Sequence, residues 1–165
     1  MSTILNTNGE PLPLQPIDNA VRGNFYVITA DWNPAVTHAL RDGAKETLEA
    51  CGVESSRIKM LSVPGTVELI SGAAMCIEKG DAAAVIVIGC VIRGDTPHFD
   101  YVCMIAAQGV AALNSGGKSP VIFGVLTVNT LDQALERAGG RLGNKGSEAA
   151  SAAVSMANLK MMLNM

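Results

Sequence analysis

The chain contains few charged and few aromatic residues. Of its 165 residues, 16% are charged and 4% are aromatic, whereas 48% are hydrophobic. The apolar content therefore consists mainly of Ala, Val, Ile, Leu and Met. So few charges are unusual for a soluble monomer of this length. The chain is either an unusually apolar α/β domain or one that buries further surface against copies of itself. We favour the second explanation, because large exposed apolar patches usually mark interfaces.

The chain also lacks an excess of positive charge, a long apolar run and an apolar leader. Its formal net charge of −3 does not suggest nucleic acid as a partner. Any anionic substrate must then be held by local cations rather than by the field of the whole protein. No apolar run approaches the length of a membrane span, and the N-terminus has no charged segment before an apolar block. We therefore expect a cytoplasmic protein without membrane contact.

The four cysteines show no C-x-x-C spacing. They are Cys51, Cys76, Cys90 and Cys103, and they lie in segments predicted to be helices or strands. Free cysteines in such positions usually serve as small buried apolar residues in a reducing compartment. No metal site is predicted.

Apolar runs and helical periodicities alternate along the chain. We expect strands at 25–30, 57–63, 85–92 and 120–126, and helices at 34–51, 67–79, 97–113, 131–137 and 146–163. This alternation predicts an α/β fold, a flavodoxin-like three-layer α/β/α sandwich with a four-stranded parallel sheet. Residues 23–165 are expected to form one domain. Residues 1–22 contain three prolines without periodicity and are predicted to be an extended arm, disordered or lying along a neighbouring subunit.

The segment 85–102 combines a buried strand, a turn and a helix start. Its apolar run ends near Gly94, and Thr96-Pro97 then precedes His98, one of only two histidines. Small molecules bind beyond the carboxyl ends of strands in open α/β sheets. The start of a helix also favours anions, and imidazole transfers protons near neutral pH. This segment is therefore the best candidate for an active site.

Several segments together resemble the lumazine synthase family. They are Asp31-Trp32-Asn33, residues 63–68, 89–102, 120–127, 136–139 and 143–146. The run from Gly89 to Val102 is very specific, whereas the others are weak alone. The resemblance covers the chain from about residue 24 to its end. It implies condensation of 5-amino-6-(D-ribitylamino)uracil with 3,4-dihydroxy-2-butanone 4-phosphate, the penultimate step of riboflavin biosynthesis. No metal or redox cofactor is implied.

The resemblance also implies roles in proton transfer and phosphate binding. His98 would shuttle protons, although a lone histidine there would otherwise suggest a surface or capping residue. Asp95 and Thr96 would hold the phosphate, Asp95 through its main chain with its carboxylate turned away. Arg137 would grip two phosphate oxygens; its alternative is a solvated ion pair with a nearby carboxylate.

The implied pyrimidine site combines an aromatic ring, a helix start, a strand end and a ring from a neighbouring subunit. These are Trp32; Thr66, Val67 and Glu68; Cys90, Val91 and Ile92; and Phe123. Three of them have a structural alternative: Trp32 as a core residue, Glu68 as a complement to the helix dipole, and Cys90 as a buried strand residue. Many relatives carry an aromatic residue where this chain has Val67, which leaves the pocket shape open there.

The resemblance further implies self-association. Family members form pentamers, and some pentamers assemble into an icosahedral shell. The short stretch from Arg137 to Gly146 favours the shell. Riboflavin synthase is a further candidate partner. The alternative function is a non-catalytic relative that binds flavin or forms a shell, but His98 and Arg137 are both present, which favours the enzyme.

Overall fold

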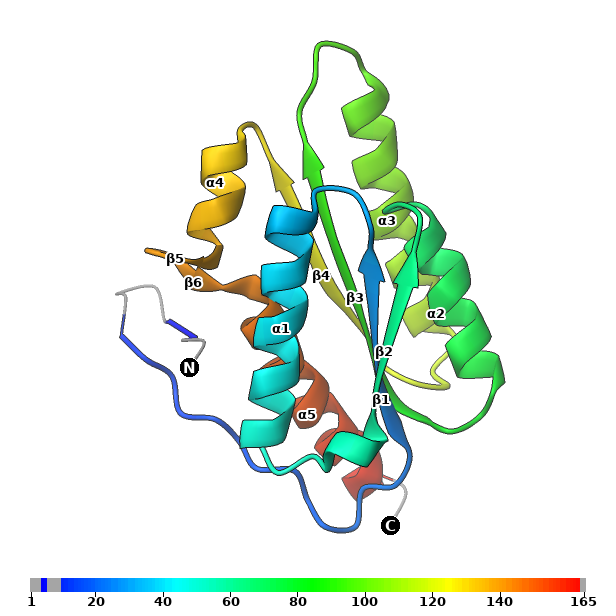
Figure 1. Ribbon diagram of the computed structural model, residues 1–165. Coiled ribbons are helices and arrows are strands. Elements are labelled where there is room, and N and C mark those ends of the chain that lie inside the picture. Colours follow the sequence, from blue (N-terminus) through cyan, green and yellow to red (C-terminus); the bar gives the residue numbers. More distant parts are fainter. Residues whose placement is uncertain (1–3, 6–9, 164–165) are drawn as a thin grey trace.

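A four-stranded parallel sheet forms the centre of the protein. The computed structural model describes residues 4–5 and 10–163. The strands are β1 (Asn24–Ala30), β2 (Ile58–Val63), β3 (Ala82–Ile92) and β4 (Val121–Val128), in the order β2-β1-β3-β4. Helices α1 (Pro34–Ala50) and α5 (Lys145–Leu163) cover one face, and α2 (Glu68–Glu78) and α3 (His98–Ser115) cover the other (Figure 1). The predicted α/β fold with a four-stranded parallel sheet flanked by helices is confirmed.

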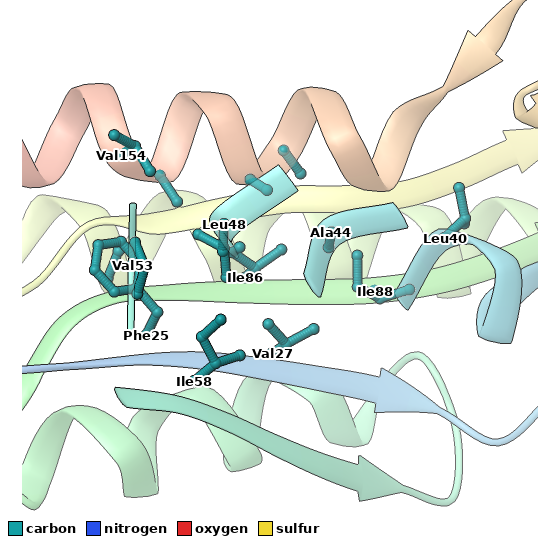
Figure 2. Close-up of a cluster of buried hydrophobic side chains, with 14 of the residues drawn as sticks. Phe25, Val27, Leu40, Ala44, Leu48, Val53, Ile58, Ile86, Ile88 and Val154 are labelled. Carbon is teal, nitrogen blue, oxygen red and sulfur yellow. The ribbon is translucent and has the colours of Figure 1, made fainter. Parts of the chain in front are cut away.

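Strand β3 is buried on both faces because it lies between β1 and β4 and beneath helices on each side. Residues 82–90 are all buried, as expected for an uninterrupted apolar run in a parallel sheet. Side chains alternate across the sheet. Ile86 and Ile88 enter the core under α1 and α5, which Figure 2 shows, whereas Val85 and Val87 enter the core under α2 and α3.

Some boundaries differ from those predicted. β3 begins at Ala82 and β4 continues to Val128, because alanines and the Thr127-Val128 pair also fit a paired strand. The glycine-rich stretch after the short helix α4 (Leu131–Glu136) forms an unpredicted antiparallel pair, β5 (Ala138–Gly140) and β6 (Gly143–Asn144). A short 3-10 helix, η1 (Ser55–Arg57), was also not predicted.

Part of the N-terminal arm lies on its own chain. The Ile17 amide donates to the Cys51 carbonyl at 2.8 Å. The Asn158 side chain accepts from the Asp18 amide at 2.9 Å and donates to the Pro16 carbonyl at 3.0 Å. The sequence did not predict this contact, because neither Asp18 nor Asn158 belongs to a recognisable motif. Residues 1–3 and 6–9 of the arm lie outside the described residues.

The predicted burial is confirmed for the free cysteines Cys51, Cys76 and Cys90, whereas Cys103 is only partly buried. Among residues 4–5 and 10–163, no helix has the length and apolar character needed to cross a membrane.

Helices α1 and α5 meet at a backbone contact. Asn144 is buried, and its Oδ1 accepts hydrogen bonds from the amides of Gly146 (2.8 Å) and Ser147 (3.2 Å) at the start of α5. Its Nδ2 donates to the Ala39 carbonyl of α1 at 3.0 Å. A Cβ at Gly146 would overlap the carbonyl group of Leu40. Only glycine therefore permits this approach.

We expect Gly146→Ala to lower the free energy of unfolding by about 2–3 kcal/mol or more, because α5 would have to move away from α1. Urea denaturation followed by circular dichroism measures this change. Gly94→Ala is the control, since a Cβ at Gly94 meets nothing within 4 Å. Equal stability of the two variants would contradict the close contact between the helices.

Candidate functional site

The site lies where β3 extends beyond β1. The pairing of β1 with β3 ends at Thr29 and Ile88, but β3 pairs with β4 as far as Ile92. The Arg93 amide donates to the Val128 carbonyl at 2.9 Å. Because backbone groups alternate between the two sides of a strand, those of Cys90 and Ile92 face the side that β1 has left. This edge of β3 can therefore present backbone groups to a ligand.

A hollow of about 500 Å³ lies along this edge. That volume is typical of small-molecule sites. Its walls come from the residues after β1, the start of α2, the end of β3 and the start of α3. The lining residues are Trp32, Asn33, Gly65, Thr66, Val67, Glu68, Cys90, Val91, Ile92, His98 and Val102. The structure therefore brings together every residue predicted for the pyrimidine except Phe123, and it adds His98.

Trp32 forms an open rim of this hollow. Its side chain is 69% exposed, so the alternative of a core residue is wrong. A Cβ added at Gly65 would lie 3.6 Å from Cδ1 of Trp32 and 2.8 Å from Oε2 of Glu68. The indole edge and the carboxylate therefore converge above the Gly65 backbone. Glu68 also lies in the first turn of α2, so the dipole role and a ligand role are compatible.

Thr66, which lines the hollow, packs against Gly89 of β3. Thr66 is buried, and a Cβ at Gly89 would lie 3.1 Å from its Oγ1 and 3.1 Å from Cδ1 of Leu69. A larger residue at position 89 would push the start of α2 away from β3. The sequence named Gly89 only as part of a motif and did not indicate this packing role.

Cys90 is only 2% exposed, and burial raises the pKa of its thiol to about 11. The thiol is therefore neutral at neutral pH and unsuited to act as a nucleophile. What Cys90 can offer a ligand is its backbone.

His98 is exposed at the first position of α3. Asp95 and Thr96 are also exposed, but they lie in the loop before the helix, with Pro97 as the N-cap. Their amides are therefore loop donors and do not belong to the first helical turn. Arg93 pairs with Asp100 at 3.2 Å and stacks on Phe99 at 4.1 Å from the ring centre, which holds this loop against α3.

Arg137 and Phe123 line a second hollow, of about 410 Å³, between β4 and α5. Phe123 is 41% exposed. Arg137 donates from Nη1 to the Gln133 carbonyl at 3.0 Å, while the neighbouring Glu136 pairs with Arg141 at 2.8 Å. Lys145 and Glu148 form an ion pair of 2.6 Å in the same hollow. Within one chain, the structure does not bring His98 and Arg137 to a common cavity.

Residues 22–161 match the family described as 6,7-dimethyl-8-ribityllumazine synthase. The chain is 51% identical over 140 residues to the enzyme of that name from Bacteroides fragilis, covering 85% of this chain and 98% of the relative. It is 49% identical to that of Phocaeicola vulgatus, covering 87% and 86%. It is 52% identical to that of Porphyromonas gingivalis, covering 81% and 83%.

The raised pKa of Cys90 predicts slow alkylation. Since a thiol with a pKa of about 11 is almost entirely protonated at pH 8, iodoacetamide should modify Cys90 much more slowly in the folded protein than in urea. Peptide mass spectrometry measures both rates. Burial also blocks access of the reagent, and the pH dependence separates the two causes. If ionisation limits the reaction, the alkylation rate of Cys90 in the folded protein should rise from pH 8 to pH 10. Fast labelling of Cys90 in the folded protein at pH 8 would contradict its burial.

Proposed function

The chain belongs to the 6,7-dimethyl-8-ribityllumazine synthase family and is a transferase of riboflavin biosynthesis, and we propose that the hollow beside His98 is its pyrimidine site. The observation that carries this proposal is the gathering of Trp32, the start of α2, the end of β3 and His98 around one hollow. The second hollow, with Phe123 and Arg137, is the complementary half of the site.

The pyrimidine ring lies against the exposed indole of Trp32. A flat heteroaromatic ring gains from stacking on an indole face, and its polar edge needs directed hydrogen bonds. The Cys90 amide and the backbone groups of Ile92 supply these bonds at the unpaired edge of β3, whereas Val91, which pairs with β4, lines the hollow. Thr66, Val67 and Glu68 contact the ring and the ribityl chain. The carboxylate of Glu68 suits the ribityl hydroxyls, because an ionised oxygen is a strong acceptor.

The phosphate of the second substrate lies beside the loop before α3. Loop amides of Asp95 and Thr96 and the Thr96 hydroxyl donate to it, while the exposed Asp95 carboxylate stays in solvent. A protein with a net charge of −3 needs a local cation for this anion. Arg137 supplies it from the second hollow, because a guanidinium binds two phosphate oxygens at once.

His98 transfers protons during the condensation. Imine formation between the ring amine and the ketone removes water, departure of phosphate requires removal of a carbon-bound proton, and ring closure requires a further proton transfer. An exposed imidazole between the pyrimidine and the phosphate can accept and return each of these protons. The enzyme also lowers the barrier by holding both substrates in one orientation.

Arg137 and Phe123 reach the pyrimidine hollow from a neighbouring subunit. The two separate hollows support this arrangement, because the proposed roles of His98 and Arg137 require both to reach the same phosphorylated substrate. It is compatible with the low charge content and with the exposed apolar side chains Tyr101, Met104 and Ile105 on α3. We propose a pentamer, assembled into an icosahedral shell because the stretch from Arg137 to Gly146 is short. A cytoplasmic location and riboflavin synthase as a partner remain part of this proposal.

We expect His98→Ala to lower kcat by about 10²-fold or more, because general acid–base catalysis contributes that much. Formation of the fluorescent lumazine from both substrates measures the rate. His38→Ala is the matched control, since His38 is exposed on α1 and does not line the pyrimidine hollow. An unchanged kcat in His98→Ala would remove the proton-transfer role, and no product from the unaltered protein would overturn the function.

A shared site also predicts complementation between the two variants, assayed at a concentration of the phosphorylated substrate far below the KM of Arg137→Ala. Arg137→Ala should raise KM for the phosphorylated substrate far more than for the pyrimidine. If the chains of His98→Ala and Arg137→Ala are mixed equally and assemble at random in a ring, about a quarter of the interfaces carry both native residues. Co-expression of the two variants should therefore restore about a quarter of the native activity.

The control for complementation is co-expression of His98→Ala with the double variant His98→Ala, Arg137→Ala. No interface in that assembly holds a native His98, so activity should stay at the level of His98→Ala alone. If the two single variants show no recovery although both chains are present in one assembly, His98 and Arg137 do not meet across an interface.

A further inference from the structure

Asn33 has a backbone conformation that its sequence context does not require. It is the only described residue other than glycine with a positive φ, at 57°, and it is the N-cap of α1. An N-cap asparagine normally has an extended backbone and accepts a hydrogen bond from its own helix. Asn33 does neither, since no side-chain cap bond is formed. Local helix energetics therefore do not explain this residue.

The side chain of Asn33 instead bonds to β3. Its Nδ2 donates to the Cys90 carbonyl at 2.9 Å. Cys90 is buried, and β1 does not pair with β3 beyond Thr29 and Ile88. A buried carbonyl without a partner is costly. The amide of Asn33 therefore replaces the missing strand at this point of the sheet.

The same residue determines the position of Trp32. The Asn33 carbonyl accepts from the amides of Val36 (2.9 Å) and Thr37 (3.0 Å), which fixes the start of α1. The Thr37 hydroxyl donates to the Trp32 carbonyl at 3.4 Å. The left-handed turn at Asn33 thus connects the start of α1 to the end of β3, and the exposed indole belongs to the preceding residue, Trp32.

We propose that Asn33 is a positioning residue that sets the gap between Trp32 and the end of β3, and thereby the affinity for the pyrimidine substrate. This inference rests on the proposed function of that hollow. Asn33 acts through the Cys90 carbonyl and the backbone of Trp32. The left-handed conformation and the amide donor are both needed, and asparagine is the residue that supplies both, because it tolerates positive φ and carries an N–H donor.

Two substitutions separate the bond from the backbone conformation. Glycine adopts positive φ without strain, so Asn33→Gly keeps the turn and removes only the donor. Aspartate also tolerates positive φ, but its carboxylate cannot donate to the Cys90 carbonyl. We expect each variant to bind 5-amino-6-(D-ribitylamino)uracil about 5-fold more weakly, since one well-placed hydrogen bond contributes about 1 kcal/mol and 1.4 kcal/mol corresponds to tenfold.

Trp32 provides the measurement, because it is the single tryptophan of the chain. Titration of the full-length protein with 5-amino-6-(D-ribitylamino)uracil should quench its fluorescence and yield Kd directly. Both variants should also shift the emission maximum of the free protein. In the steady-state assay, KM for the pyrimidine should rise by the same factor while kcat changes less, because Asn33 does not touch the reacting atoms.

Asn114→Asp is the matched control. Asn114 also bridges a helix to a strand, with Nδ2 donating to the Val121 carbonyl at 2.8 Å and Oδ1 accepting from the Val121 amide at 2.9 Å. It lies where α3 ends and β4 begins and does not line the pyrimidine hollow. Its substitution should lower stability but leave pyrimidine affinity unchanged.

The outcomes are separable. If the unaltered protein shows no quenching by the pyrimidine, the stacking role of Trp32 in the proposed function fails first. If it is quenched and Asn33→Gly and Asn33→Asp bind as tightly as the unaltered protein, the positioning role is wrong. Loss of affinity in Asn114→Asp equal to that in the Asn33 variants would also overturn it, since the effect would then follow from general destabilisation. Should Asn33→Asp fail to fold, Asn33→Gly decides alone.

Discussion

The unequal lengths of β1 and β3 determine where the hollow lies that we propose as the pyrimidine site. From Gly89 to Ile92, β3 keeps its partner on the β4 side and has none on the β1 side. An exposed backbone edge in this position must be bonded by side chains, water or a ligand. Asn33 satisfies the Cys90 carbonyl, and the rest of the edge faces the hollow. The start of α2 and the start of α3 close the hollow because both follow strands that end at the same side of the sheet.

Much of the fold was predictable because it depends on local patterns. Val85 to Ile92 is a continuous apolar run of the length of a strand buried on both faces, and the helices predicted to end at residues 51 and 79 do end just before Gly52 and Gly80, which have positive φ. The pairing of β5 with β6 was not predictable, since glycine-rich segments of two or three residues have no periodicity. The α1–α5 contact was also not predictable, because it depends on the packing of Gly146 against a helix that is distant in the sequence.

The site residues were predictable as a set only through the resemblance, not through their chemistry. Tryptophan and cysteine are both common in protein cores, and only the structure shows that the indole of Trp32 is exposed and the thiol of Cys90 is buried. Asn33 was noted beside Trp32, but no sequence signal indicates a left-handed backbone or a bond to a residue 57 positions later. The structure of one chain places His98 and Arg137 in different hollows. Their sharing of a site therefore depends on contacts between chains.

The proposed division of the site between subunits would link catalysis to assembly and would also account for the composition. The chain has few charged residues, and apolar side chains are exposed on α3. Its net charge is negative, so an anionic substrate needs a local cation. If Arg137 arrives from a neighbour, the cation that binds the phosphate is present only where apolar surfaces have already been buried. The phosphorylated substrate would then be bound only at a complete interface, where water is excluded and a guanidinium–phosphate pair is strongest. On this proposal the apolar surface and the phosphate site depend on each other, because His98 and Arg137 lie in separate hollows within one chain.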